Sequence, residues 1–254
     1  MTSWDLNNKN ILVTGGTKGI GKATVVSCLS LGAKVLFTAR NEVEVNALEQ
    51  ELKATYTHVK GIAADVSDPT DREKIKHWIT DQWEVLHSLV NNAGINIRKA
   101  TLAYTEEEYQ KVLAINLLAP FELSTLLYPC LEKAEQASII NVASVAGSLD
   151  VRTGSPYGMS KAGLIQQSRN LAVEWASAGI RVNTVSPWFT TTPLTQNLLA
   201  NDEKKSNIIA RTPLQRVAEA EEVAAVITFL AMDKASYVTG QNWIVDGGLT
   251  ANAL

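Results

Sequence analysis

A regular alternation of short apolar segments with segments of helical periodicity limits the fold of this chain more than any other feature of its sequence. Apolar, β-branched runs predict strands at residues 10–14, 34–39, 58–64, 86–90, 138–143, 180–186 and 242–246. Helical spacing predicts helices at residues 19–30, 42–54, 68–83, 106–132, 157–177 and 220–231. Apolar strands joined by helices are typical of a parallel sheet with both faces covered. The sequence therefore predicts an α/β fold, a doubly wound, seven-stranded parallel sheet with helices on both faces.

The chain is expected to form a single domain over residues 1–254. Its 254 residues, of which 46 % are apolar, suffice for one large α/β domain with a substantial core. The helix at 106–132 is expected to bend at Pro120. The long irregular stretch lies at about residues 187–213, and stretches of this length are usually functional, so we expect it to be a substrate loop.

A glycine-rich turn separates the first predicted strand from the first predicted helix. Gly15 would allow the tight turn, while Gly19 and Gly21 would allow close approach to a pyrophosphate and close packing of helix against strand. The N-terminus of that helix favours phosphate charge. An ordinary strand–helix turn is the alternative, but the context indicates a Rossmann dinucleotide site. The expected cofactor contacts in the turn are Gly15, Thr17, Lys18, Gly19, Ile20 and Gly21.

Two cations near this turn bear on the choice of nicotinamide cofactor. An acidic residue at the end of the second strand would bind a ribose 2′-hydroxyl and repel a 2′-phosphate. This chain has Arg40 at that position, and Lys18 in the turn could face the same phosphate. The pair predicts NADP(H) rather than NAD(H), unless both cations are only solvated surface charges.

The ends of the third and fourth predicted strands add further candidate contacts. Asp65 and Val66 close the third strand, where a carboxylate could accept a hydrogen bond from an adenine amino group. The segment 91–94, Asn-Asn-Ala-Gly, closes the fourth strand and suits a backbone packed beneath a cofactor. Its asparagines could equally tie neighbouring strands together. The expected cofactor contacts here are Asp65, Val66, Asn92, Ala93 and Gly94.

Three residues indicate proton transfer beside that nucleotide site. Tyr157 and Lys161 are four residues apart and therefore share one face of the predicted helix. An ammonium one turn away is expected to lower the pKa of the phenol and to favour phenolate. Ser144 ends the fifth apolar run, where its hydroxyl can meet that of Tyr157. Together the three residues indicate a carbonyl/alcohol oxidoreductase.

These motifs together resemble the short-chain dehydrogenases/reductases over essentially the whole chain. The matching features are Thr14–Gly21, Asn91–Gly94, Asn116, Ser144, Tyr157 with Lys161, Arg181-Val182-Asn183 and Val245-Asp246-Gly247-Gly248. The segments 236–241 and 248–252 are similar to the tropinone-reductase-like branch, which is a much weaker match.

The resemblance implies a role for each catalytic candidate. Tyr157 would be the general acid in reduction and the general base in oxidation, and Lys161 would hold the nicotinamide ribose and lower the pKa of Tyr157. Ser144 would position the substrate oxygen. Asn116 would hold a water that links Lys161 to solvent. The resemblance also implies cofactor contacts after the sixth strand, at Pro187, Thr190 and Thr192.

One position departs from the family pattern. Pro-Gly usually follows the sixth strand, whereas this chain has Pro187-Trp188. A glycine lets the backbone turn freely beside the nicotinamide, which a tryptophan cannot be assumed to do. Trp188 could line the substrate pocket and favour flat or apolar ketones, or it could pack into the core. The expected substrate pocket consists of Ser144, Tyr157 and Trp188.

Composition and charge argue against several other classes of protein. A net charge of −3 does not suggest a nucleic-acid partner. The three histidines lack metal-ligand spacing, so no metal site is expected. No apolar run approaches the roughly eighteen residues that span a bilayer, and the first six residues do not resemble a signal peptide. Cys28 and Cys130 are expected to be reduced core residues, which favours a cytoplasmic location.

The sequence thus predicts reversible, metal-free, NADPH-dependent reduction of a small-molecule ketone to a secondary alcohol. One alternative is that the same residues act on a 3-oxoacyl thioester or a sugar. Another is a non-catalytic NADP-binding scaffold, which would not require the intact Ser144, Tyr157 and Lys161.

Association with further copies of the chain is also expected. The helix at 157–177 carries apolar residues around much of its circumference, namely Ala162, Leu164, Ile165, Leu171, Ala172 and Trp175. The helix at 106–132 has an apolar middle between residues 112 and 127. Such surfaces favour subunit contacts, and the sequence predicts a homotetramer, with a dimer as the alternative.

Overall fold

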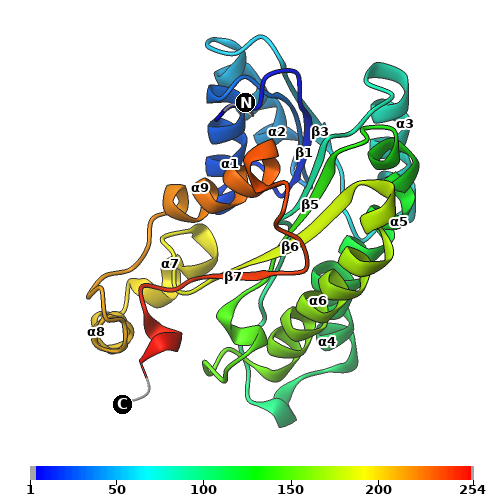
Figure 1. The fold of residues 1–254 in the computed structure, drawn as a ribbon. Helices are drawn as coiled ribbons and strands as arrows, with labels where there is room; N and C mark the ends of the chain where they lie inside the picture. Colours follow the sequence, from blue (N-terminus) through cyan, green and yellow to red (C-terminus); the bar gives the residue numbers. More distant parts are fainter. Residues whose placement is uncertain (1–3, 253–254) are drawn as a thin grey trace.

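The computed structural model describes residues 4–252 and contains one parallel sheet in the order β3-β2-β1-β4-β5-β6-β7 (Figure 1). The strands are β1 (Asn10–Thr14), β2 (Lys34–Ala39), β3 (Val59–Ala63), β4 (Ser88–Asn91), β5 (Ala137–Val142), β6 (Ile180–Pro187) and β7 (Asn242–Val245). The strand order reverses between β1 and β4, which is where ligands bind in sheets of this kind. The predicted fold class, a single-domain Rossmann fold, is confirmed. The expectation about a signal peptide falls partly on residues 1–3, which lie outside the described residues.

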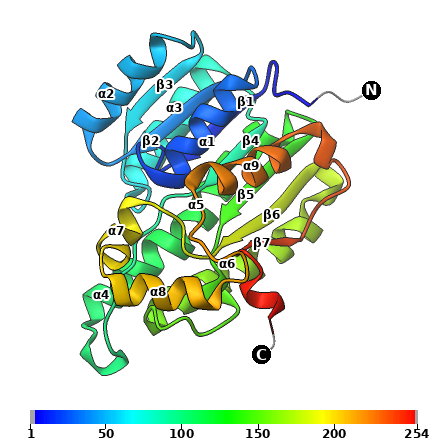
Figure 2. The same ribbon diagram turned by 90° about the vertical axis from the view of Figure 1, so that its left-hand side faces the viewer.

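Two groups of helices cover the two faces of the sheet (Figures 1 and 2). One group consists of α1 (Gly19–Ser30), α2 (Glu42–Lys53) and α9 (Ala220–Ala231), and the other of α3 (Pro69–Gln82), α5 (Ala119–Glu132) and α6 (Ser155–Glu174). Alternation along β1 explains the two layers. Ile11 and Val13 belong to the core beneath the first group, and Leu12 belongs to the core beneath the second. All three side chains are fully buried, so both faces of the sheet contribute hydrophobic stabilisation.

The long helix predicted at 106–132 is interrupted by a turn of π-helix. α4 (Glu106–Leu113) is followed by the π-helical segment Ala114–Leu118 and then by α5. Pro120, in the first turn of α5, has no backbone N–H to donate to the carbonyl of Asn116 four residues earlier. An inserted wider turn accommodates that loss, and such turns often occur at functional sites. The irregularity expected at Pro120 therefore takes the form of a π-helical turn that contains Asn116.

The same helical stretch corrects the expectation that no apolar run approaches the length needed to span a bilayer. Glu106–Glu132 is one helical run of 27 residues that is long and apolar enough to cross a membrane by length and composition. However, 44 % of its apolar window is buried inside the protein, and Leu123 and Leu127 belong to the core on the α3 and α6 face. A core helix of a folded domain passes the same test, so the run is weak evidence for a membrane-spanning segment.

The stretch expected to be an irregular loop at 187–213 contains two helices. They are α7 (Pro193–Leu199) and α8 (Asp202–Arg211), and they lie beyond one end of the sheet (Figure 2). Pro193 occupies the first turn of α7, and the Asn201 side chain caps α8 by accepting from the Lys204 backbone N–H. α8 buries only Ile208 and is otherwise mostly polar and exposed, which is why the sequence pattern did not reveal it.

Candidate active site

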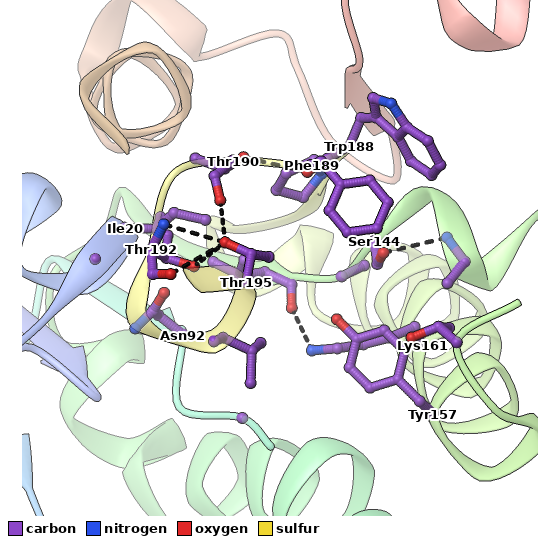
Figure 3. A pocket seen from close by; sticks show the side chains of 18 of the residues that line it. Ile20, Asn92, Ser144, Tyr157, Lys161, Trp188, Phe189, Thr190, Thr192 and Thr195 are labelled. Carbon is purple, nitrogen blue, oxygen red and sulfur yellow. Dashed lines mark hydrogen bonds between the residues drawn. The ribbon is translucent and has the colours of Figure 1, made fainter. Parts of the chain in front are cut away.

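A cavity of about 280 Å³ opens where β1, β4, β5 and β6 end. Its lining comes from the glycine turn, the segment after β4, the end of β5, the start of α6 and the segment after β6. Figure 3 shows Ser144, Tyr157 and Lys161 grouped at one side of this cavity and Thr190, Thr192 and Thr195 at the other. The fold thus brings Ser144, Tyr157 and Lys161 together beside the glycine turn, whereas the fourth predicted catalytic residue, Asn116, does not line the cavity.

The glycine turn is packed closely against the end of β4. A Cβ atom on Gly21 would lie 2.1 Å from the Gly15 carbonyl oxygen and 2.5 Å from Asn92 Nδ2, so only glycine fits there. Gly15 itself has a φ of +65°, a backbone conformation that residues other than glycine rarely adopt. Asn92 Nδ2 donates to the carbonyls of Thr14 and Gly15, at 2.9 and 3.1 Å. Asn92 therefore ties the end of β4 to the turn while it also lines the cavity.

Asn91 ties neighbouring strands together, which is the structural role considered for both Asn91 and Asn92. Its Nδ2 donates to Asn141 Oδ1 at 2.8 Å, which joins β4 to β5. Asn141 in turn donates to Ser168 Oγ on α6 at 2.8 Å. These side chains are fully or almost fully buried, so the polar chain fixes the sheet beneath the site.

A second cavity, of about 610 Å³, extends from the same turn toward the ends of β2 and β3. It shares four lining residues with the first, namely Gly15, Lys18, Ala93 and Gly94. Thr17, Arg40, Asp65 and Val66 also line it. Two cavities that meet at a glycine turn match the two halves of a dinucleotide, with the pyrophosphate at the turn. The residues present therefore fit a nicotinamide cofactor.

The two cations assigned to the 2′-phosphate are not equivalent. Lys18 Nζ lies 2.7 Å from Glu44 Oε1, so this lysine already has a carboxylate partner. No sequence motif pointed to Glu44, because its position on α2 beside the turn follows only from the packing. Arg40 is exposed and, within residues 4–252, forms no ion pair. Burial raises the pKa of Asp65, but hydrogen bonds from Ser67 and the charge of Arg40 outweigh this effect and the net pKa is lowered.

Lys161 is buried at the start of α6. Its Nζ donates to the Val142 carbonyl at 2.7 Å and lies 5.7 Å from the centroid of the Tyr157 ring. Burial lowers the pKa of Lys161 to about 8, because removing the ammonium from water disfavours its charged form. Two of its three N–H donors have no protein acceptor among the described residues and are available to a ligand.

Tyr157 differs from the expectation about its acidity. Burial raises the pKa of Tyr157, while a hydrogen bond with Ser144 and the positive charge of Arg98 oppose that rise. The prediction that Lys161 lowers the pKa of Tyr157 is therefore wrong for the cofactor-free protein. Desolvation outweighs the opposing effects, and Lys161 donates to a carbonyl instead of to the phenol. The phenol is consequently protonated at neutral pH.

Ser144 and Asn116 complete the catalytic candidates. Ser144 Oγ accepts from the Ala146 backbone N–H at 3.1 Å, which leaves its proton to be donated to Tyr157 or to a bound ligand. Asn116 Oδ1 accepts from the Ile95 N–H at 2.9 Å, and its Nδ2 donates to the Ile95 carbonyl at 2.9 Å. The same Nδ2 also donates to Ser160 Oγ on α6 at 3.2 Å. Asn116 thus joins the π-helical turn to the segment after β4 and to the helix that carries Lys161.

The segment after β6 closes the cavity. Trp188 lines it, and its indole N–H donates to Thr212 Oγ1 at 3.1 Å, so the half-buried side chain is anchored at its polar end. Phe189 packs against it with ring centroids 4.6 Å apart. Thr195, which belongs to no recognised motif, donates to the Thr190 carbonyl at 2.5 Å. The predicted residues Pro187, Thr190 and Thr192 all line the same cavity.

Other lining residues had no motif to identify them. Arg98 and Thr153 lie in segments without regular periodicity, and only the folding of those segments over the site places them there. Within the described part of the chain, no three His, Cys, Asp or Glu side chains gather in the manner of metal ligands.

Comparison with known proteins agrees with this geometry. The model of a family described as "Enoyl-(Acyl carrier protein) reductase" matches residues 15–250. A tropinone reductase homologue of Arabidopsis thaliana is 43 % identical over 98 % of this chain and 95 % of its own length. A chloroplastic homologue from the same plant is 38 % identical over 98 % of this chain and 78 % of its own length, so such relatives are not confined to the cytoplasm.

Solved structures show the same likeness. A putative gluconate dehydrogenase from Agrobacterium tumefaciens has a TM-score of 0.95 at 28 % identity, covering 99 % of this chain and 100 % of its own. A gluconate 5-dehydrogenase from Burkholderia cenocepacia, in complex with NADP and tartrate, has a TM-score of 0.92 at 26 % identity, covering 98 % of each chain. With relatives above 40 % identity along nearly its whole length, the chain belongs to the short-chain dehydrogenase/reductase family, whose members are oxidoreductases acting on CH–OH groups.

Proposed function

We propose that this protein reduces a ketone to a secondary alcohol, reversibly, with NADPH as the hydride donor and Tyr157 as the general acid. The observation that carries the proposal is the convergence of Tyr157, Ser144 and Lys161 on a cavity that shares lining residues of the glycine turn with a second cavity. Relatives named tropinone reductase homologues and a structural neighbour that binds NADP support it.

In this proposal the chain orients the cofactor and the substrate and supplies the proton. The reduced nicotinamide of bound NADPH supplies the hydride. The turn from Gly15 to Gly21 would hold the pyrophosphate, Arg40 the 2′-phosphate and Asp65 the adenine amino group. Lys161 would use its free N–H donors on the nicotinamide ribose, and Thr190 or Thr192 would contact the carboxamide.

Proton transfer falls to Tyr157. Its phenol is protonated at neutral pH because burial raises its pKa, and this is the form that a general acid requires. Ser144 would donate to the substrate oxygen and hold it near the phenol. As hydride reaches the carbonyl carbon, that oxygen takes the Tyr157 proton, and the phenolate formed is stabilised by the nearby Lys161 ammonium. Asn116 would hold a water through which Lys161 returns a proton from solvent.

Absorbance at 340 nm tests the proposal. The enzyme is mixed with NADPH and with each ketone of a panel in turn. We expect at least one ketone to be reduced to a single enantiomer of its alcohol, with oxidation of NADPH. The protein is the non-catalytic scaffold instead if its binding of NADPH is detected by fluorescence but none of the ketones, thioesters and sugars tested causes NADPH oxidation. The 3-oxoacyl thioester remains an alternative on the same residues.

A sugar or sugar acid is a second candidate substrate. Two structural neighbours at TM-scores of 0.95 and 0.92 are named as gluconate dehydrogenases, one of them putative. The panel therefore includes an oxidised sugar acid beside simple ketones, and the ratio of their kcat/KM values decides between the two classes.

Cofactor choice is tested by Arg40→Asp. The substitution is expected to weaken NADPH binding by about tenfold, the lower end for one lost charged hydrogen bond at an exposed site, and to shift preference toward NADH. Arg211→Asp, the same charge reversal on α8 outside both cavities, is the matched control. Isothermal titration with each cofactor measures both effects. A wild type that binds NADH as tightly as NADPH would contradict the NADP(H) assignment.

The proposed assembly is a homotetramer, although the structure changes the reason for it. Of the α6 residues expected at an interface, only Ala162 is exposed, and the others are buried in the chain's own core. Among the other exposed apolar side chains, we select two regions for subunit contacts, one near the α4–α5 junction and one on the edge strand β7. The first region has Leu118 and Phe121 at 50 and 47 % exposure, and the second has Ile244 at 44 %. Two separate regions allow two interfaces, which a tetramer with closed symmetry requires.

Light scattering at micromolar concentration tests the assembly. The wild type is expected to have about four times the mass of the 27.5 kDa chain. Phe121→Glu or Ile244→Glu is expected to give dimers, because each places a charge in one of the two proposed apolar contacts. Val43→Glu, at a 77 % exposed position on α2, should leave the mass unchanged. A stable, fully active wild-type monomer would overturn the proposed assembly.

A further inference from the structure

The charged side chains that line the 280 Å³ cavity are all of one sign. Lys18, Arg98 and Lys161 contribute to its wall, and no aspartate or glutamate of the described residues does so. A cavity with this lining favours an anion over a cation or a neutral group of the same size.

Two of these three cations are already engaged. Lys18 pairs with Glu44 at 2.7 Å, on the side of the adenosine cavity. Lys161 is buried beside Tyr157 and donates to the Val142 carbonyl. Each of them therefore has a place in the cofactor site or in proton transfer.

Arg98 is not engaged in this way. It is exposed, its contact is a long hydrogen bond of 3.4 Å from Nη1 to the Leu194 carbonyl, and within residues 4–252 no carboxylate pairs with it. A guanidinium has five N–H donors, so most of those of Arg98 remain free. This arginine has no evident structural role that would account for its charge at the cavity.

The position of Arg98 relates it to the substrate rather than to the cofactor phosphates. It lies in the segment after β4, its Nη1 donates to the Leu194 carbonyl on α7, and it lines the same cavity as Tyr157. Its charge acts on the Tyr157 phenol and opposes the rise in the pKa of that group. Arg98 does not line the adenosine cavity, where Arg40 lies.

The lining of this cavity is mainly apolar. Val151, Trp188 and Phe189 line the same space and offer contact to a carbon chain or ring. Thr153 is buried there and adds one hydroxyl beside them. The cavity thus combines an apolar lining with a cation, Arg98, and the proton donor, Tyr157.

We propose that Arg98 is a specificity-determining residue that binds a carboxylate of the substrate, so that the preferred substrates are keto acids. The planar guanidinium matches the two oxygens of a carboxylate, and an anion placed there holds the ketone carbon at a fixed distance from Tyr157. The inference rests on the proposed ketone reduction and narrows its substrate class.

Paired substrates test the inference. The kcat and KM of the wild type are measured for a series of keto acids and for the methyl ester of each one. Each acid is expected to have a KM at least about tenfold lower than its ester, the range for one charged hydrogen bond at a partly exposed site. Arg98→Gln should raise KM for the acids toward that for the esters and change kcat less. Arg98→Lys should retain part of the preference. Arg211→Gln, which removes a charge on α8 outside the cavity, should retain all of it.

A binding experiment keeps the test independent of turnover. Calorimetric titration of the NADP⁺-saturated enzyme with a keto acid and with its ester requires no reaction, and the same preference for the acid is expected. NADPH affinity should be unchanged in Arg98→Gln, whereas a loss there would show that Arg98 binds a cofactor phosphate and would overturn the inference. Equal affinity for acid and ester would overturn it as well. If neutral ketones are reduced and keto acids are not preferred, the proposed reduction stands and the inference about Arg98 fails. If keto acids bind selectively but are not turned over, the inference about Arg98 stands and the proposed reduction fails.

Discussion

Replacing Tyr157 with phenylalanine is expected to lower kcat for ketone reduction by roughly 10²–10⁴-fold, the usual contribution of a positioned general acid. The variant keeps the ring and its packing and loses only the acidic proton. NADPH affinity should therefore stay close to that of the wild type, since Lys161 and the glycine turn are unaltered. Steady-state assays at 340 nm give kcat, and fluorescence titration gives the affinity for NADPH.

The control for that variant is Tyr237→Phe, which removes the hydroxyl of a fully exposed tyrosine and should leave kcat unchanged. Retention of more than about a tenth of the wild-type kcat by Tyr157→Phe would exclude Tyr157 as the acid. Loss of NADPH binding in the same variant would show a structural role instead.

Replacing Lys161 with methionine is expected to have two opposite effects. Activity and cofactor affinity should fall strongly, because the variant lacks both the proposed ribose contact and the positive charge beside the phenol. The cofactor-free protein, in contrast, should become more stable at pH 7. Burial lowers the pKa of Lys161 from 10.5 to about 8, a shift that corresponds to a cost of about 3 kcal/mol for the buried ammonium. Loss of the hydrogen bond to Val142 offsets about 1 kcal/mol of that gain.

The pH dependence of this difference follows from the direction of the pKa shift. Below pH 8 the ammonium is charged in both states, and its burial opposes folding in full. Between pH 8 and 10.5 the unfolded chain binds a proton that the folded protein does not, so wild-type stability rises with pH. The advantage of the variant should therefore shrink over that range, as measured by chemical denaturation of both proteins at pH 7 and at pH 10.5.

Comparing the two proteins at each pH cancels the titration of other groups. Lys205→Met, at an exposed position on α8, should show no such pH-dependent difference. A Lys161→Met protein that is less stable than the wild type at pH 7 would show that the buried ammonium stabilises the fold.

Sequence patterns predicted the sheet well because burial on both faces imposes a clear signature on each strand. The interior strand β1 is apolar throughout its middle, where Ile11 and Val13 face one layer and Leu12 faces the other. The stretch at 187–213 was misjudged for the complementary reason. α8 buries Ile208 but leaves residues 201–207 exposed, so its sequence contains too few apolar positions to indicate a packed helix.

The candidate site divides in the same way. Tyr157, Lys161 and the glycine turn could be selected because local spacing along the chain sets their relative positions. Glu44 and Arg98 could not, since each reaches the site from a separate element through tertiary packing. The direction of the Tyr157 pKa was also wrong, because sequence spacing reveals a neighbouring charge but not the extent of burial.

The π-helical turn at Ala114–Leu118 has a consequence for reading related sequences. A π turn holds one residue more than an α-helical turn, and each residue in an α-helix rotates the next by roughly 100°. That extra residue lets Asn116 face Ser160 on α6 while Leu123 and Leu127 still face the sheet. A relative that lacks one residue between 114 and 118 would form a continuous α-helix, with only one of these two alignments preserved. A one-residue gap at this point in an alignment would therefore signal the loss of the Asn116 site, even where Ser144, Tyr157 and Lys161 are all retained.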